Sequence, residues 1–159
     1  MIIDDEVLAV LTAIVVVACV VSAALLIPRS TEPFLALGLL GEKGKIGDYP
    51  KTVVAGEPVK LNVFIANYMG KAALLKVMAK ISSKGNIPTN STPLDVMPIW
   101  EYDIVLGNNE NATVPVQLIL EKEGVNQALV FELWIYNTTR RSWVYTGRWN
   151  HLYINVTKG

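Results

Sequence analysis

The sequence contains few of the residues that most often carry chemistry or cross-link a fold. Its 159 residues include one cysteine, Cys19, and one histidine, His151. A single cysteine excludes an intrachain disulfide and a cysteine-based metal site. Core packing must therefore hold the fold, as it can in a domain of about 130 residues. A lone histidine lacks the orienting partner that acid–base catalysis uses, so we interpret His151 as a surface or edge residue.

Sequence motifs of known active sites are also missing. The chain has no His-Glu-x-x-His zinc motif, no phosphate-binding loop and no Gly-x-Ser-x-Gly nucleophile elbow. Glu101 and Asp103 share one strand face and could bind Ca²⁺ together with Asp95, but a solvated strand face is the simpler interpretation. We therefore predict that the protein is not an enzyme and that it holds no cofactor and no metal.

The chain has no excess of charge of either sign. Lys and Arg number 14, and Asp and Glu number 14. Nucleic-acid binding requires a basic surface, which this balance argues against. The sequence also has no polybasic segment for an anionic membrane face. Nucleic acid is therefore excluded as a predicted partner.

The most prominent feature that is present is an apolar run over residues 7–27. Its 21 residues carry no charge, and only Thr12 and Ser22 are polar. About 20 residues in a helix span the hydrocarbon core of a bilayer, and Pro28 followed by Arg29 is typical of a helix end. We thus divide the chain into an acidic tail (1–6), a transmembrane helix (7–27), a linker (28–33) and a folded domain (34–159).

Two other interpretations of the apolar run remain open. A signal peptide cleaved near Ser22 is one, although the segment before the run is acidic rather than basic. A lipid attachment at Cys19 is the other, although the apolar run continues past this residue. If neither applies, Cys19 is a small apolar residue facing lipid.

Four N-glycosylation motifs, Asn-x-Ser/Thr, are present, whereas about one is expected by chance. They begin at Asn90, Asn111, Asn137 and Asn155. Each lies in a predicted turn or on the polar face of a strand, where a sugar would be solvated, although the same residues also suit ordinary turns. N-linked glycans imply an extracytoplasmic domain. The charges flanking the helix favour the opposite orientation, but long translocated domains override that rule.

After Pro33 the apolar residues recur with a period of two, which predicts β-strands. For example, Leu129, Phe131, Leu133 and Ile135 alternate with polar or outward residues. The segment 72–81 fits a strand better than a helix, although Lys76 and Lys80 have helical spacing. We expect about seven strands, over residues 34–40, 59–67, 75–81, 100–106, 114–121, 129–135 and 151–156. Short turns between them favour an all-β, immunoglobulin-like antiparallel β-sandwich.

The stretch from Phe34 to Asn67 resembles the extracellular part of an archaeal membrane-protein family of unassigned function, the domain of unknown function 1616. The resemblance rests on the motifs Gly38-Leu39-Leu40-Gly41, Gly44-Lys45, Asp48-Tyr49-Pro50, Gly56-Glu57 and Ile65-Ala66-Asn67. It implies an archaeal, surface-facing sandwich and supplies no activity. Similar proteins often carry several helices before this domain, whereas the present chain has one.

Aromatic residues gather on the predicted outer face of the last hairpin. They are Trp134, Tyr136, Trp143, Tyr145 and Trp149. Aromatic pairs across neighbouring strands stabilise a sheet, and exposed Trp and Tyr are also enriched where proteins bind partners. These five residues are the candidate interaction face, with a sugar or a protein as the possible ligand.

Three functions fit a chain with one membrane anchor and one folded module. The first is an accessory or structural subunit of a membrane or cell-envelope assembly, a single-pass surface glycoprotein that contacts lipid and other envelope proteins. The second is a self-assembling, pilus-like filament subunit that binds copies of itself. The third is a carbohydrate-binding surface module, which rests on the aromatic face alone.

Overall fold

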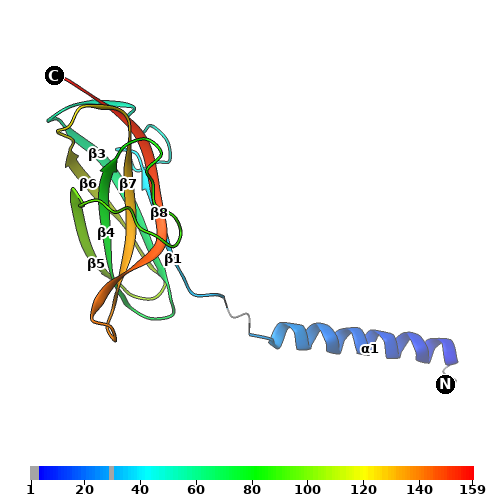
Figure 1. Cartoon of the computed structure of the whole chain (residues 1–159). Helices are drawn as coiled ribbons and strands as arrows, with labels where there is room; N and C mark the ends of the chain where they lie inside the picture. Colours follow the sequence, from blue (N-terminus) through cyan, green and yellow to red (C-terminus); the bar gives the residue numbers. More distant parts are fainter. Residues whose placement is uncertain (1–3, 29–30) are drawn as a thin grey trace. The chain divides into compact units, whose positions relative to one another are not determined.

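A computed structural model describes residues 4–28 and 31–159 (Figure 1). Residues 1–3 of the predicted tail and residues 29–30 of the predicted linker, including Arg29, lie outside the described residues. The chain forms two compact units, which divide between Glu32 and Pro33. The elements are α1 (Asp5–Leu26), β1 (Phe34–Leu40), β2 (Thr52–Val54), β3 (Pro58–Tyr68), β4 (Ala73–Ser82), β5 (Trp100–Leu106), β6 (Glu110–Ile119), β7 (Gly124–Asn137) and β8 (Ser142–Thr157).

Helix α1 begins with the acidic residues Asp5 and Glu6 and is apolar around its whole circumference from Val7 to Leu26. Its 22 residues extend for about 33 Å at the rise of an α-helix, which matches the hydrocarbon thickness of a bilayer. Its two hydroxyl groups are satisfied inside the helix, because Thr12 Oγ1 donates to Leu8 O (2.8 Å) and Ser22 Oγ donates to Ala18 O (2.7 Å). Neither hydroxyl therefore requires a hydrogen-bond partner outside the helix.

The second unit is a β-sandwich of two sheets, which confirms the predicted fold class. One sheet has the strand order β1-β3-β6, and the other has the order β2-β8-β7-β4-β5. Neighbouring strands are antiparallel, except that the short strand β2 runs parallel to the end of β8. The described residues form eight strands, where about seven were expected, and the last predicted strand, 151–156, is the end of the 16-residue strand β8.

The core lies between the inner faces of the two sheets. Leu61, Val63 and Ile65 of β3 are buried in one cluster with Phe131 and Leu133 of β7. Each large apolar side chain that is fully buried contributes about 1.5–3 kcal/mol relative to exposure. Burial also alternates along β4, so the segment 72–81 is a strand, as predicted, and not a helix.

The free edges of both sheets are blunted. On the edge strand β1, Asn150 Nδ2 donates to Leu37 O (2.9 Å) and Tyr49 OH donates to Leu39 O (2.7 Å). Strand β2 is only three residues long, β5 carries two acidic residues, and Pro115 interrupts the donor row of β6. Side-chain caps, charges, proline and short length are the devices that prevent a sheet edge from pairing with another chain.

Asn67 joins the turns at one end of the sandwich. Its side chain is completely buried, and its Nδ2 donates to Leu106 O and Lys71 O at 2.9 Å each. Its Oδ1 accepts from Met69 N (2.9 Å), and its backbone oxygen accepts from Asn109 N (2.7 Å). These bonds connect the β3–β4 turn to the β5–β6 turn.

We expect Asn67→Ala to lower the free energy of unfolding of residues 33–159 by about 3 kcal/mol, because the Met69 amide and the carbonyl groups of Lys71 and Leu106 lose their partner. Urea denaturation measures the change. The matched control is Asn111→Ala, at an exposed position of β6, for which a change within about 0.5 kcal/mol is expected. Equal losses in the two variants would contradict the assigned role of Asn67.

Candidate functional site

The five aromatic residues of the candidate face lie on the outer side of the five-stranded sheet. Strand pairing places Trp134 opposite Tyr145 and Tyr136 opposite Trp143, and the ring centroids of each pair are 5.4 Å apart. Trp149 lies further along β8, opposite Glu132, and its ring centroid is 5.4 Å from that of His151. The structure therefore brings four of the five together and places the fifth beside the lone histidine.

The aromatic rings turn their surfaces toward one another rather than forming a flat platform. All five are half-buried, and the ring planes of the two pairs meet at 51° and 70°. The Lys76 ammonium lies 4.5 Å from the Trp143 ring centroid, a distance typical of a cation–π contact. Such cross-strand pairs contribute about 0.2–1 kcal/mol each to the sheet.

Lys76 also engages the two carboxylates that the sequence suggested as metal ligands. Its ammonium lies 3.8 Å from Glu101 and 3.7 Å from Asp103. Strand pairing aligns Asp103, Lys76, Trp134 and Tyr145 in one row across four strands. A lysine from the adjacent strand therefore offsets one of the two negative charges on this strand face.

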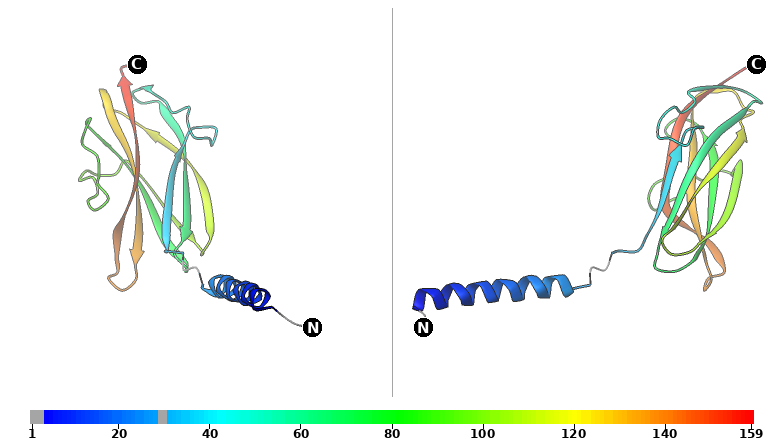
Figure 2. Two further views of the ribbon diagram at one scale, coloured as in Figure 1. Left: turned by 90° about the vertical axis from the view of Figure 1, so that its right-hand side faces the viewer. Right: turned by 180° about the vertical axis from the view of Figure 1, so that it is seen from behind.

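The loop from Ser83 to Ile99, here called the strap, covers part of this outer face (Figure 2). Leu94 of the strap is buried and packs against Ala128 and Val130 of β7. Gly147 of β8 has a φ of +76°, and a side chain there would collide with the Asn90 carbonyl oxygen. The strap thus lies directly on the sheet.

A buried ion pair fixes the strap to the sheet. Lys80 Nζ lies 2.8 Å from Glu132 Oε2, and the two side chains are 5% and 0% exposed. Lys80 donates to Leu94 O (2.7 Å), Leu94 N donates to Glu132 Oε1 (2.6 Å), and Trp134 Nε1 donates to Glu132 Oε2 (3.1 Å). The sequence pattern does not reveal this cluster, because both charged residues occupy strand positions that alternation assigns to solvent.

Tyr145 holds a second point of the strap. Its hydroxyl donates to Thr89 O (2.8 Å). Burial, together with the nearby charge of Glu132, raises the pKa of Tyr145 to about 12. The phenol therefore remains protonated, and remains a hydrogen-bond donor, over the whole physiological range.

The four glycosylation motifs occupy separate places on the domain. Asn90 is exposed on the strap, and Asn111 is exposed on the edge strand β6. Asn137 and Asn155 are half-buried, and their Oδ1 atoms accept from Arg140 N (2.9 Å) and Asn126 N (2.8 Å). Both bonds use the amide oxygen, whereas a glycan is attached through the nitrogen. All four remain predicted sites.

No protein-family model and no curated protein sequence matches the chain. Among solved structures, the CARDB domain of a Pyrococcus furiosus protein is similar at 14% identity and a TM-score of 0.46, over 79% of this chain and 90% of that domain. A Listeria innocua β-glucosidase is similar at 12% identity and a TM-score of 0.44, over 80% of this chain and 16% of that protein. An Escherichia coli α2-macroglobulin is similar at 15% identity and a TM-score of 0.45, over 80% of this chain and 17% of that protein. Likenesses this weak carry no argument about function.

We expect Glu132→Gln to lower the free energy of unfolding by about 3 kcal/mol, because it leaves the Lys80 ammonium buried without its counter-charge. The Leu94 amide should then exchange its hydrogen faster than in the parent protein. Glu101→Gln is the matched control, since Glu101 is an exposed partner of Lys76 and its loss should cost less than about 1 kcal/mol. Unchanged protection of Leu94 would show that the ion pair does not hold the strap.

The phenol of Tyr145 should ionise near pH 12 rather than near pH 10. The pKa of Tyr145 is higher in the folded state than in the unfolded state. The stability that the protonated phenol contributes is therefore complete below about pH 10 and is lost as the pH rises to about 12. Ultraviolet titration of tyrosinate measures the step, and Tyr145→Phe should remove it. A Tyr145→Phe variant with the same high-pH step as the parent would contradict this assignment.

Proposed function

We propose that the protein is a non-catalytic, single-pass membrane glycoprotein whose β-sandwich lies outside the cytoplasm, as an accessory or structural subunit of a membrane or cell-envelope assembly. The observation that supports it is α1, which is long enough to span a bilayer and carries no charged residue from Val7 to Leu26. An apolar surface of this size requires lipid or other helices as its surroundings.

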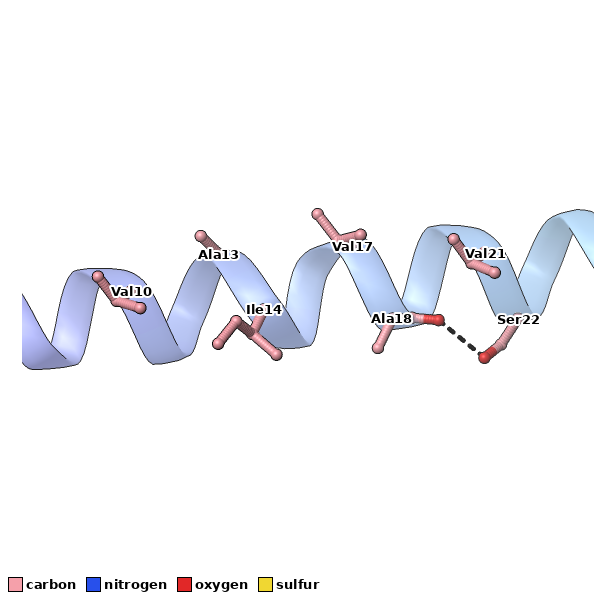
Figure 3. A pocket seen from close by; sticks show the side chains of 7 residues that line it. All are labelled: Val10, Ala13, Ile14, Val17, Ala18, Val21 and Ser22. Atoms are coloured by element: carbon pink, nitrogen blue, oxygen red, sulfur yellow. Dashed lines mark hydrogen bonds between the residues drawn. The ribbon is translucent and has the colours of Figure 1, made fainter.

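Figure 3 shows one side of this helix, on which apolar side chains follow one another from turn to turn. They include Val10, Ile14, Val17 and Val21, and Ser22 turns its hydroxyl back onto the helix. This surface suits van der Waals packing against lipid tails or against other helices. The predicted glycans and the resemblance to the archaeal surface-protein family support the extracytoplasmic placement of the domain.

The same structure weighs against the two other functions. A filament built by strand exchange requires an open sheet edge, whereas the edges of this sandwich are capped, charged, short or interrupted by proline. A filament would therefore have to assemble through α1. A sugar-binding platform requires free ring faces, whereas the rings of the aromatic face pack on one another and on Lys76.

Extraction of the full chain from native membranes tests the anchoring. The protein should remain in the membrane after an alkaline wash, and Val17→Arg should raise the fraction that the wash releases, because an arginine at the middle of a spanning helix costs about 2.5–3.5 kcal/mol. Val125→Arg, at an exposed site on the domain, is the matched control and should leave the protein in the membrane. Release of both variants, or of neither, would argue against a spanning helix.

Mild detergent extraction followed by a pulldown through a C-terminal tag tests the subunit role. Other membrane proteins should be recovered in a fixed ratio, and mass spectrometry of the glycopeptides reports which side the domain occupies. Recovery of a monomer would contradict the subunit role. Recovery as a polymer that shears from cells would favour the filament, and quenching of tryptophan fluorescence by envelope sugars would favour the carbohydrate-binding module.

A further inference from the structure

The end of the sandwich at which the chain enters β1 has a distinct composition. This entry end consists of Phe34 and the turns at residues 69–72, 107–109 and 138–141, which the strand pairing brings to one level. Figures 1 and 2 show the start of β1 and the β7–β8 hairpin at this end, and the C-terminus at the opposite end. Hydrogen bonds of Asn67 and Asn108 tie two of the turns together, so the end is a defined surface.

The entry end carries most of the positive charge excess of the domain. Residues 33–159 hold 13 of the 14 Lys and Arg of the chain but only ten of its 14 Asp and Glu. Three exposed bases lie in its turns, namely Lys71, Arg140 and Arg141. The one acid beside these turns is Glu110, whose carboxylate accepts a hydrogen bond from Gly107 N (2.6 Å). The remainder of the domain is nearly balanced, with ten bases and nine acids.

An exposed aromatic group accompanies these bases. The Phe34 side chain is 43% exposed, and its ring lies 4.8 Å from that of Tyr68. Arg148 lines the same hollow as Phe34. Exposed Phe side chains together with Lys and Arg are typical of protein segments that lie at the level of lipid headgroups.

The length of the chain between α1 and β1 limits how far this end can lie from a membrane. Seven peptide steps separate Leu26 from Pro33, and they span at most about 25 Å when fully extended. A tether this short keeps the entry end at a high effective concentration near the surface of any bilayer that holds α1.

We propose that the entry end docks onto the anionic lipid headgroups of the bilayer that holds α1, with Lys71, Arg140 and Arg141 contacting the phosphates. The docking rests on the proposed membrane anchoring and adds a second, electrostatic contact to it. Each base near an anionic surface raises the ratio of docked to undocked domain about fivefold. The docking excludes a glycan at Asn137, because a sugar on the hairpin would occupy the contact.

The test uses the full chain, made in a host that attaches no N-glycans, in vesicles of phosphatidylcholine with or without phosphatidylglycerol. On a Cys19→Ser background, Thr138→Cys carries a fluorophore on the hairpin, and Glu123→Cys carries it at the opposite end. A quencher on the lipid headgroups reports contact. We expect stronger quenching at position 138 than at position 123, and only in vesicles that contain phosphatidylglycerol. The difference should disappear in molar salt, where the Debye screening length is about 3 Å.

Replacing Lys71, Arg140 and Arg141 together by Gln should lower the ratio of docked to undocked domain by about 100-fold. The matched control replaces Lys43, Lys45 and Lys122 by Gln, the same change of charge at exposed sites of the opposite end, and should keep the quenching. Equal effects of both sets, or quenching that ignores salt, would overturn the docking. So would a glycan on Asn137 in the native protein. Loss of the chain from the vesicles in an alkaline wash would instead refute the anchoring.

Discussion

The inner faces of the two sheets pack against each other without a covalent cross-link, because the one cysteine of the chain lies in α1. Every other feature of the domain depends on this contact. It uses one side of each strand for the core and thereby determines which side chains remain for the outer face. The aromatic pairs, the Lys76 contacts and the strap are all built on the side that core packing leaves free.

The sandwich could be predicted from the sequence because one-sided burial leaves a period of two in the strands. Leu129, Phe131 and Leu133 are such a case, and all three are fully buried. The same rule failed for Lys80 and Glu132, which alternation assigns to solvent. Their burial depends on the strap, which returns over the sheet from a loop with no periodicity. Strand β2 was missed because three residues are too few to show a pattern.

The position of the aromatic face could be predicted from the sequence, but the packing of its rings could not. Alternation places Trp134 and Tyr136 opposite the core stripe, and the hairpin brings Trp143 and Tyr145 beside them. The sequence could not show that the rings meet at steep angles or that Lys76 lies over one of them. Those details depend on the strand register, including the irregularity between Leu133 and Trp134. The charge excess at the entry end was hidden for the same reason, since its bases are far apart in the sequence.

The ends of the domain lie at opposite poles of the sandwich, with β1 beginning at one pole and β8 finishing at the other (Figure 1). Tension applied between Pro33 and Gly159 therefore runs along the strands. It loads the seven residue pairs of β1 with β3, and the long pairing of β8 with β7, in shear. Hydrogen bonds loaded in this way must yield together rather than one after another. Tension between these two ends therefore loads the terminal strands in shear and does not peel them from the sheets one residue at a time.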